Sequence, residues 1–325
     1  MKSSDTVTST DTLSADARIV ITGAAGLVGQ NLALRLTERG YTDIVGIDKN
    51  AHNLAILKRH QPDVRTLLAD LAVPGDWQDE IKRADAVVLN QAQIGGLDWE
   101  DFRRNNIDAT GHILDAVRRA DDAPYIVHIS SSVVNSRADD FYTRSKTLQE
   151  EMVARSGLDF TALRPTLMFG WFDRKHLGWL RRFMAKAPAF PIPGSGRYAR
   201  QPLYVGDFCR VVIACLEQQP GGIHDISGQE VLDYIDLIRT IKSKTGERTP
   251  IFRIPYWSFF AGLWGAARIM PDPPFTIHQL RALVIPETFP VVDWPGMFGV
   301  EATPFAEAVD ETFNHPVHSG VVLEF

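Results

Sequence analysis

Short apolar runs alternate with amphipathic stretches along the first half of the chain. Six runs rich in Val, Ile and Leu have the length and composition of buried strands. They lie at residues 18–22, 43–48, 64–69, 86–90, 125–130 and 160–163. Between them apolar residues recur at helical spacing, most clearly over 26–39, 106–119 and 141–155. The alternation predicts right-handed βαβ units, and so a doubly wound α/β Rossmann fold with a parallel sheet.

The pattern changes after Arg164. Residues 165–202 are dense in Trp, Phe, Pro and Arg, and the last third of the chain is again rich in aromatic residues and proline. In between, a helix at 205–218 and a strand at 223–226 are expected to return to the main sheet, and a further helix covers 233–245. The predicted organisation is a cofactor domain and a smaller, mostly C-terminal substrate lobe. The domain comprises 18–165 and 203–227, and the lobe 166–202 and 228–325.

Neither end of the chain shows a clear targeting or membrane segment. Residues 1–17 are rich in Ser, Thr and Asp, so we expect a disordered tail rather than a signal peptide. The longest apolar stretch, Tyr256–Met270, is shorter than a spanning helix and contains Arg268. It predicts a buried or interfacial helix, with contact to a membrane surface as the alternative.

Composition narrows the class of protein. The chain has 325 residues and a formal net charge of −6, which argues against a general nucleic-acid binder. Its two cysteines, Cys209 and Cys215, form no disulfide framework, so a cytoplasmic protein with both thiols in the core is expected. No metal site is predicted, because His315 and His318 have no evident third ligand.

The segment Thr22–Gly29 carries the strongest chemical signal. It reads TGAAGLVG between a predicted strand and a predicted helix. Gly23 permits a tight turn, Gly26 leaves room for a pyrophosphate, and Gly29 lets the helix pack on the sheet. The helix N-terminus, with Ala25, Leu27 and Val28, then offers N–H groups and a positive dipole to phosphate. A dinucleotide site follows, with a ligand-free turn as the alternative.

Acidic residues follow the next two strands. Asp48 lies 19 residues after Gly29, where a carboxylate accepts hydrogen bonds from the adenosine ribose and repels a 2′-phosphate. This favours NAD over NADP, although Lys49 is adjacent. Asp70, before Leu71, is a candidate contact for the adenine amino group, and a turn aspartate is the alternative reading.

Tyr142 and Lys146 are the candidate catalytic pair. They lie four residues apart, on one face of the helix that follows the fifth strand. A nearby ammonium lowers the pKa of a phenol, and Lys146 is expected to do this while it holds the nicotinamide ribose. The preceding strand ends in Ser130–Ser132, so Ser131 or Ser132 is expected to hold the substrate oxygen.

These pieces, in this order, resemble the extended short-chain dehydrogenase/reductase family of the NAD-dependent epimerase/dehydratase type, over residues 18 to about 315. The resemblance implies Tyr142 as the acid–base group, Lys146 as its partner and Ser131, rather than Ser132, as the third member. It also implies a homodimer formed through helices 106–119 and 141–155. The further cofactor contacts that it implies are Asn90, Gln91, Asn106, Ile129 and Pro165.

The resemblance leaves the substrate open. A basic stretch over 171–200 carries seven basic residues and one acid, which suggests an anionic small molecule. Arg200 lies where nucleotide-sugar enzymes of this family hold a diphosphate-binding arginine, whereas Leu167 replaces their asparagine. The remaining substrate candidates are Gln93, Ser132, Arg197 and Trp171.

The predicted function is therefore NAD-dependent hydride transfer at a secondary alcohol or ketone. A sugar or nucleotide sugar is the first candidate substrate, acted on by an epimerase or a dehydrogenase. A reductase of a non-sugar substrate, similar to 3β-hydroxysteroid dehydrogenases, and a non-catalytic NAD-binding scaffold are the alternatives.

Overall fold

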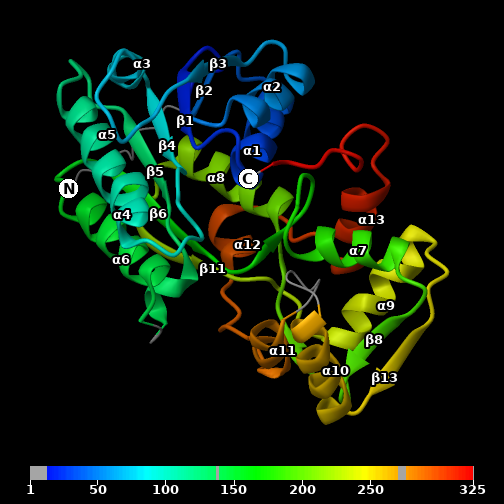
Figure 1. Cartoon of the computed structure of the whole chain (residues 1–325). Coiled ribbons are helices and arrows are strands. Elements are labelled where there is room, and N and C mark those ends of the chain that lie inside the picture. The colour runs from blue at the N-terminus through cyan, green and yellow to red at the C-terminus, as the bar shows by residue number, and fades with distance from the viewer. Residues whose placement is uncertain (1–12, 137–138, 270–275, 325) are drawn as a thin grey trace, which may run out of the picture. The chain divides into compact units, whose positions relative to one another are not determined.

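The computed structural model describes residues 13–136, 139–269 and 276–324. The chain forms two compact units, each assembled from separate stretches of sequence (Figure 1). Unit 1 comprises residues 1–165, 208–225 and 294–300, and unit 2 comprises 166–207, 226–293 and 301–325. Most of the predicted tail, residues 1–12, lies outside the described residues.

A seven-stranded sheet forms the centre of unit 1. Its order is β11 (Gly222–Ile226), β6 (Phe160–Pro165), β5 (Tyr125–Ile129), β4 (Ala86–Leu89), β1 (Arg18–Thr22), β2 (Asp43–Asp48) and β3 (Arg65–Leu68). Pairing is parallel from β3 through to β6, and Val20 lies in register with Val45 and Val87. The predicted doubly wound fold and the return of residues 222–226 to this sheet are confirmed.

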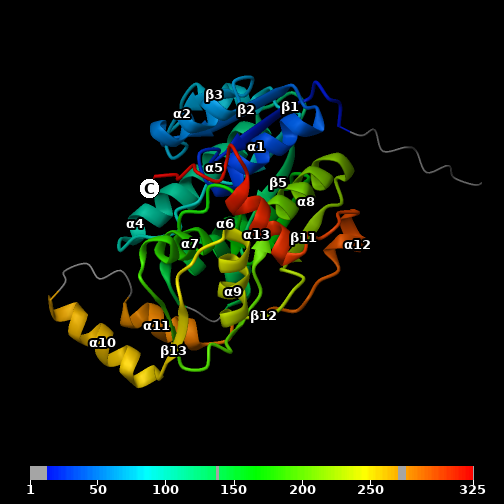
Figure 2. The same cartoon turned by 90° about the vertical axis from the view of Figure 1, so that its right-hand side faces the viewer.

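Helices cover both faces of this sheet (Figures 1 and 2). Those of unit 1 are α1 (Leu27–Arg39), α2 (Ala51–His60), α3 (Trp77–Lys82), α4 (Trp99–Phe102), α5 (Ala109–Arg118), α6 (Phe141–Ala154), most of α8 (Val205–Gln218) and α12 (Trp294–Phe298). Ile81 of α3, Ile113 of α5 and Val153 of α6 share one apolar core with strand residues such as Val87. Helices α1 and α2 pack on β1, β2 and β3.

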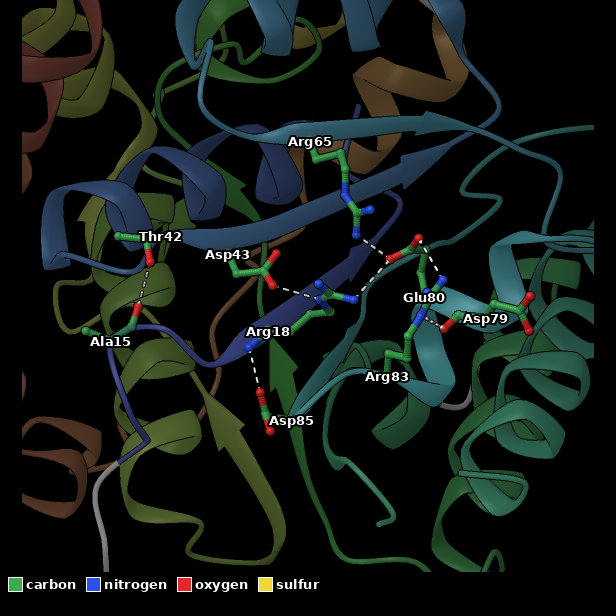
Figure 3. A network of polar contacts seen from close by, with 9 residues as sticks. All are labelled: Ala15, Arg18, Thr42, Asp43, Arg65, Asp79, Glu80, Arg83 and Asp85. Atoms are coloured by element: carbon green, nitrogen blue, oxygen red, sulfur yellow. Dashed lines mark hydrogen bonds and ion pairs between the residues drawn. The ribbon is translucent and has the colours of Figure 1, made fainter. Parts of the chain in front are cut away.

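Ion pairs join the amino ends of the strands in unit 1 (Figure 3). The Arg18 side chain lies 2.8 Å from the Asp43 carboxylate and 3.8 Å from that of Glu80, and the Arg18 backbone N–H donates to Asp85. Glu80, on α3, also pairs with Arg65 at the start of β3. The starts of β1, β2 and β3 are thereby connected at the edge opposite their carboxyl ends.

Unit 2 consists of short strand pairs and helices. Its pairs are β7 (Met168–Phe169) with β10 (Leu203–Tyr204), β8 (Phe190–Pro193) with β13 (Ile251–Ile254), and β9 (Ala199–Arg200) with β12 (Leu232–Asp233). Its helices are α7 (Leu177–Lys186), α9 (Tyr234–Thr245), α10 (Tyr256–Ile269), α11 (Ile277–Val284) and α13 (Phe305–Asn314). Helix α13 packs against α9, and α10 lies beside α11 (Figure 2).

Helix α10 contradicts the buried form of the prediction for the apolar stretch 256–270, and the interfacial form stays a prediction. No side chain is buried between Tyr256 and Arg268, and Trp257 is 73% exposed. The helix is therefore not buried in its unit, and Met270 lies outside the described residues. No helix in the described part of the chain is long and apolar enough to cross a membrane.

The unit boundaries also differ from the prediction. Residues 203–207 belong to unit 2, because β10 pairs with β7 and the Asp207 carboxylate accepts hydrogen bonds from Thr303. Residues 294–300 belong to unit 1, where Phe298 is buried beside His224. Long-range contacts of this kind leave no local pattern in the sequence.

The predicted tail ends earlier than Ala17. Ser14–Ala17 form a turn, and the Ala15 carbonyl accepts hydrogen bonds from Thr42 (Figure 3). Cys209 and Cys215 are buried on α8, as expected.

Candidate active site

The glycine loop between β1 and α1 has the geometry of a phosphate cradle. Gly23 has a φ of +65°, and a Cβ there would lie 2.7 Å from the Gln91 Cα. A Cβ at Gly29 would lie 2.5 Å from the Ala24 Cα, so only glycine lets α1 pack this closely on the loop. Gly26 is different, because its Cβ would meet nothing closer than 3.5 Å.

The first turn of α1 is open to an anion. No side chain caps the helix at Gly26, and its first residues are Leu27 and Val28. Uncapped N–H groups at a helix N-terminus bind phosphate well. The absence of a side chain at Gly26 and this uncapped turn together fit the pyrophosphate of a dinucleotide.

Asp48 ends β2 beside this loop. Its carboxylate accepts hydrogen bonds from the Ala25 N–H, at 3.0 Å, and from the Asn50 N–H, at 2.9 Å. Burial raises its pKa, and the backbone donors only partly oppose this effect. An ionised carboxylate has about four acceptor positions, so Asp48 retains capacity for the two hydroxyls of a ribose.

The other residues predicted at the adenosine end lie near one another but are engaged within the protein. Lys49 donates to Asn105 at 2.8 Å. The Asp70 carboxylate accepts a hydrogen bond from Arg104 at 2.5 Å and another from the Ala72 N–H. Leu71 is buried in the core cluster of unit 1, so its side chain has a packing role.

The side-chain amides of Asn90 and Gln91, which follow β4, hydrogen-bond to the glycine loop and to the residue before it. Asn90 donates to the Gly23 carbonyl at 3.0 Å. The Gln91 side-chain oxygen accepts a 2.6 Å hydrogen bond from Thr22, the residue before the loop. Both residues were predicted at the nicotinamide end of the cofactor, and in the structure their side chains hold the loop in place.

A π-helix (η1, Arg103–Asp108) precedes α5 where the sequence predicts one regular helix. Its wider turn carries Asn106, which is buried and donates to the Gln93 carbonyl and to Ser145 on α6. Asn106 also accepts a hydrogen bond from the Gln93 N–H. Asn106 thereby joins the loop after β4 to α6, which carries the candidate pair Tyr142 and Lys146, and π-helical turns often mark functional sites.

The Ser131 side chain lies near the Tyr142 phenol and acts to lower the pKa of that phenol. Ser131 caps a 3₁₀ turn (η2, Ser132–Asn135) and is buried, whereas Ser132 is the first residue of that turn and only partly buried. The structure thus brings Tyr142 and Ser131 together. Burial raises the pKa of Tyr142, the nearby Ser131 side chain opposes this, and Asp140 raises it further. The expected lowering of this pKa by Lys146 is not seen in the structure, where loss of solvent around the phenol is the largest cause.

Lys146 is buried on α6, with 1% of its surface exposed. Its ammonium donates to the Ile129 carbonyl at 2.9 Å and to the Gln149 side-chain oxygen. Burial lowers the pKa of Lys146 to about 7, and the nearby Glu150 carboxylate opposes this effect. Lys146 therefore titrates in the neutral range in the protein without ligands.

An ion pair between Glu150 and Arg164 holds the loop that contains Ser131. The Glu150 carboxylate accepts a 2.5 Å hydrogen bond from Ser130 and two from the Arg164 guanidinium, at 2.9 and 2.5 Å. Arg164 precedes Pro165, the buried last residue of β6, and also donates to Asn135. The pair fixes both ends of the segment that contains Ser131.

Unit 2 contains a cavity of about 590 Å³. Leucine, tryptophan, proline and phenylalanine side chains form more than half of its lining, including Leu167, Leu237 and Phe289. Arg174, Lys175 and His176 add polar groups to the wall. A concave, mainly apolar cavity with a few polar groups is typical of small-molecule sites.

Arg200 lines this cavity, but its guanidinium is used within the protein. It donates to the carbonyls of Ala199 and Ile285, at 2.8 and 2.9 Å, and to that of Leu283. These hydrogen bonds hold the 283–285 segment against β9. Arg200 therefore connects two walls of the cavity.

The two remaining substrate candidates of unit 2 lie outside the cavity lining. Arg197 is exposed in the turn before β9. Trp171 is only 4% exposed, donates to the Glu311 carbonyl at 2.9 Å, and packs its ring against His315 and His318. These contacts give Trp171 a packing role. In the described part of the chain, no group of three or more His, Cys, Asp and Glu side chains has the geometry of a metal site.

The sequence reasoning missed four residues of the unit 1 site: Thr110, Gln149, Glu150 and Arg164. The spacing of four residues between Lys146 and Glu150 could have indicated that the two side chains lie together, because residues four apart share a helix face. Nothing in the sequence indicated that Gln149 and Thr110 meet, since they come from different helices.

Comparison with known proteins identifies the family of the chain. A sequence model of the NAD dependent epimerase/dehydratase family matches residues 19–227. The chain is 24% identical to a 2-alkyl-3-oxoalkanoate reductase of Stenotrophomonas maltophilia, over 84% of this chain and 91% of that protein. It is 22% identical to a 3-beta-hydroxysteroid dehydrogenase of Mycolicibacterium neoaurum, over 73% and 72% of the two chains.

Solved structures share the fold. WbmH of Bordetella bronchiseptica, crystallised with NAD⁺, matches with a TM-score of 0.71 and 17% identity, over 94% of this chain and 100% of that one. UDP-glucuronic acid 4-epimerase of Bacillus cereus, in complex with NAD, matches with a TM-score of 0.67 and 18% identity, over 92% and 96%. The family match, which spans more than half of the chain, identifies it as a member of the NAD dependent epimerase/dehydratase family.

Proposed function

We propose that the chain is an NAD-dependent oxidoreductase that interconverts a secondary alcohol and a ketone on a largely apolar substrate with an anionic group. The observation that carries the catalytic part is the buried Lys146 ammonium, held by the Ile129 carbonyl and Gln149 one helical turn after Tyr142, with Ser131 near the phenol. A phenol and a nearby hydroxyl form a pair of groups able to bind one substrate oxygen.

Each residue has a distinct role in this proposal. Tyr142 takes the hydroxyl proton during oxidation and returns it during reduction, while Ser131 holds the substrate oxygen. Lys146, when protonated, favours the phenolate form of Tyr142. The glycine loop and Asp48 would hold NAD, which would supply the hydride-transfer chemistry when bound.

The cavity of unit 2 supports an apolar substrate. Most of its wall is hydrocarbon, and Leu167 lies at the position where the similar nucleotide-sugar enzymes carry an asparagine. Arg200 is occupied by three backbone carbonyls rather than presented as a diphosphate ligand. Arg174 and Lys175 supply positive charge for a carboxylate or similar group. The two sequence relatives act, by their names, on an oxoalkanoate and a hydroxysteroid.

A nucleotide-sugar epimerase is the second candidate. The basic stretch over 171–200 favours it, and so does the printed substrate of the Bacillus cereus structure. In an epimerase the ketone stays bound and the hydride returns to its opposite face, so no NADH accumulates.

The test uses the purified full chain with NAD or NADH and three panels of compounds. These are 3-oxo and 3-hydroxy alkanoates with alkyl branches, 3β-hydroxysteroids, and UDP-sugars. We expect NADH absorbance to change with members of the first two panels, and Tyr142→Phe to abolish this change. Conversion of a UDP-sugar to its epimer, without turnover of the apolar panels, would overturn the substrate assignment in favour of the second candidate.

A further inference from the structure

Three polar side chains from different elements meet at Thr110, inside unit 1. The Thr110 hydroxyl donates to the Asn106 carbonyl at 2.6 Å. It accepts hydrogen bonds from the Gln91 amide, at 3.1 Å, and from the Gln149 amide, at 2.9 Å. Thr110, Asn106, Gln91 and Gln149 are all buried. A hydroxyl has one donor and two acceptor positions, so Thr110 is fully used.

This arrangement fixes which way each glutamine amide points. The Asn106 carbonyl can only accept, so Thr110 must donate to it and must accept from the NH₂ groups of both glutamines. The Gln91 oxygen then faces Thr22, which donates to it at 2.6 Å. The Gln149 oxygen faces Lys146, and its ammonium donates to that oxygen. The side-chain amide of Gln149 also donates to the backbone carbonyl of Gln91, at 3.5 Å.

We propose that Gln149 is a positioning residue of the active site: its oxygen holds the Lys146 ammonium in place, and the glutamines on Thr110 join that lysine to the glycine loop. The ammonium has acceptors on two sides, Gln149 and the Ile129 carbonyl, which leaves its third N–H for a partner in the site. A buried ammonium with two fixed acceptors keeps its proton better than one with a single acceptor.

Other ionisable groups also act on Lys146. Glu150, on the same helix, stabilises its charge. His128 on β5 is fully buried, and the charge of Lys146 is among the causes that lower the pKa of this imidazole. Tyr142 lies one helical turn before the lysine. Because these three groups remain when Gln149 is changed, the effect of the amide is separable from theirs.

The proposal is tested by titrating Lys146 directly, in the protein without cofactor or substrate. The chain has nine lysines, and labelling them with ¹³C allows the Lys146 signal to be assigned by its loss in Lys146→Met. We expect Gln149→Leu to lower the Lys146 titration midpoint by about one pH unit. We expect Gln149→Glu, which keeps the acceptor and adds charge, to raise it.

Gln91→Leu is the matched control. It removes an amide from the same Thr110 hydroxyl but no contact of Lys146, so the midpoint should stay within about 0.3 pH units of that of the unchanged protein. Equal shifts in Gln149→Leu and Gln91→Leu would overturn the proposal, and so would a lowered midpoint in Gln149→Glu. If Gln149→Leu does not fold, Gln149→Glu decides alone, because an unchanged or lowered midpoint contradicts the proposed contact.

The effect on the pH profile of the reaction has the opposite direction to the shift of the Lys146 midpoint. A lysine that loses its proton more easily stabilises the Tyr142 phenolate less, so the rise of the oxidation rate with pH should move to higher pH in Gln149→Leu. The kcat should fall while the KM for NAD changes less than about twofold. The inference rests on the proposed role of Lys146 but not on the substrate. If no panel compound reacts, the titration still decides whether Gln149 holds this lysine.

Discussion

The Ser131 side chain lies near the Tyr142 phenol and acts to lower its pKa, whereas Ser132 begins the following 3₁₀ turn. Two adjacent serines thus have different environments, and their substitution separates their roles. We expect Ser131→Ala to lower kcat by about 100-fold, the lower range for loss of an acid–base or oxygen-holding group. Ser132→Ala, as the matched control, should change kcat by less than about threefold. An equal loss in both variants would contradict the assignment of Ser131.

Lys146 should make the stability of the protein depend on pH. Its pKa is about 7 in the folded protein, below its ordinary value of 10.5, so between these pH values the unfolded chain binds the proton more strongly. Unfolding then takes up a proton, and the free energy of unfolding due to this group rises with pH in that window.

The measurement is the Tm of Lys146→Met and of the unchanged protein without ligand. The gain in Tm of Lys146→Met over the unchanged protein should be greatest near about pH 6 and shrink towards pH 10, because the buried charge is lost as pH rises. A difference that stays constant with pH would show that Lys146 titrates outside this window.

Asp48 should determine which dinucleotide binds. Its carboxylate ends β2 beside the Ala25 N–H, where a 2′-phosphate would meet a like charge. We expect Asp48→Asn to reduce the preference for NADH over NADPH roughly tenfold or more, as measured by fluorescence titration with both. Asn retains an acceptor for the Ala25 N–H, so the glycine loop should stay in place. Tighter binding of NADPH than NADH by the unchanged protein would already refute this role.

Arg200 should stabilise the lobe rather than bind a diphosphate. Arg200→Met removes donors from the carbonyls of Ala199, Leu283 and Ile285. We expect the free energy of unfolding to fall by about 1–3 kcal/mol. Arg197→Met, at an exposed position, should change it by less than about 0.5 kcal/mol. Unchanged stability in Arg200→Met together with loss of UDP-sugar binding would support the epimerase instead.

Glu80 should stabilise unit 1 without affecting the cofactor. Its carboxylate is 13% exposed and lies near Arg18, Arg65 and Arg83. We expect Glu80→Gln to lower the free energy of unfolding by about 1–2 kcal/mol, between the values for exposed and buried ion pairs. The dissociation constant for NADH should stay within about twofold, because the pairs lie at the amino ends of the strands. A marked loss of NADH affinity would contradict this separation.

The sequence predicted the main sheet and the residues at its carboxyl edge because both depend on local pattern. Apolar runs and glycine spacing identified β1, α1 and the loop between them. A spacing of four residues placed Tyr142 and Lys146 on one helix face. Each of these patterns spans only a few residues, and over that length the periodicity of the backbone determines which side chains share a face.

What the sequence did not predict depends on contacts between distant segments. Gln149 meets Thr110 across two helices, and Arg200 meets Leu283 across 83 residues. The position of residues 294–300 in unit 1 depends in the same way on which surfaces pack together. The π-helix at Asn106 is a local feature, but it differs from an α-helix by one hydrogen-bond step and has no compositional signature.

The assembly of unit 1 from three stretches of sequence limits how the protein can be divided or recombined. A fragment that ends at Pro165 would lack β11 and would expose β6 as an open edge strand, which favours aggregation. It would also lack α12, whose Trp294 and Phe298 are buried. Exchanging the substrate lobe for that of a relative therefore requires cuts at every crossing between the units, and a simple fusion at residue 165 would produce two incomplete halves.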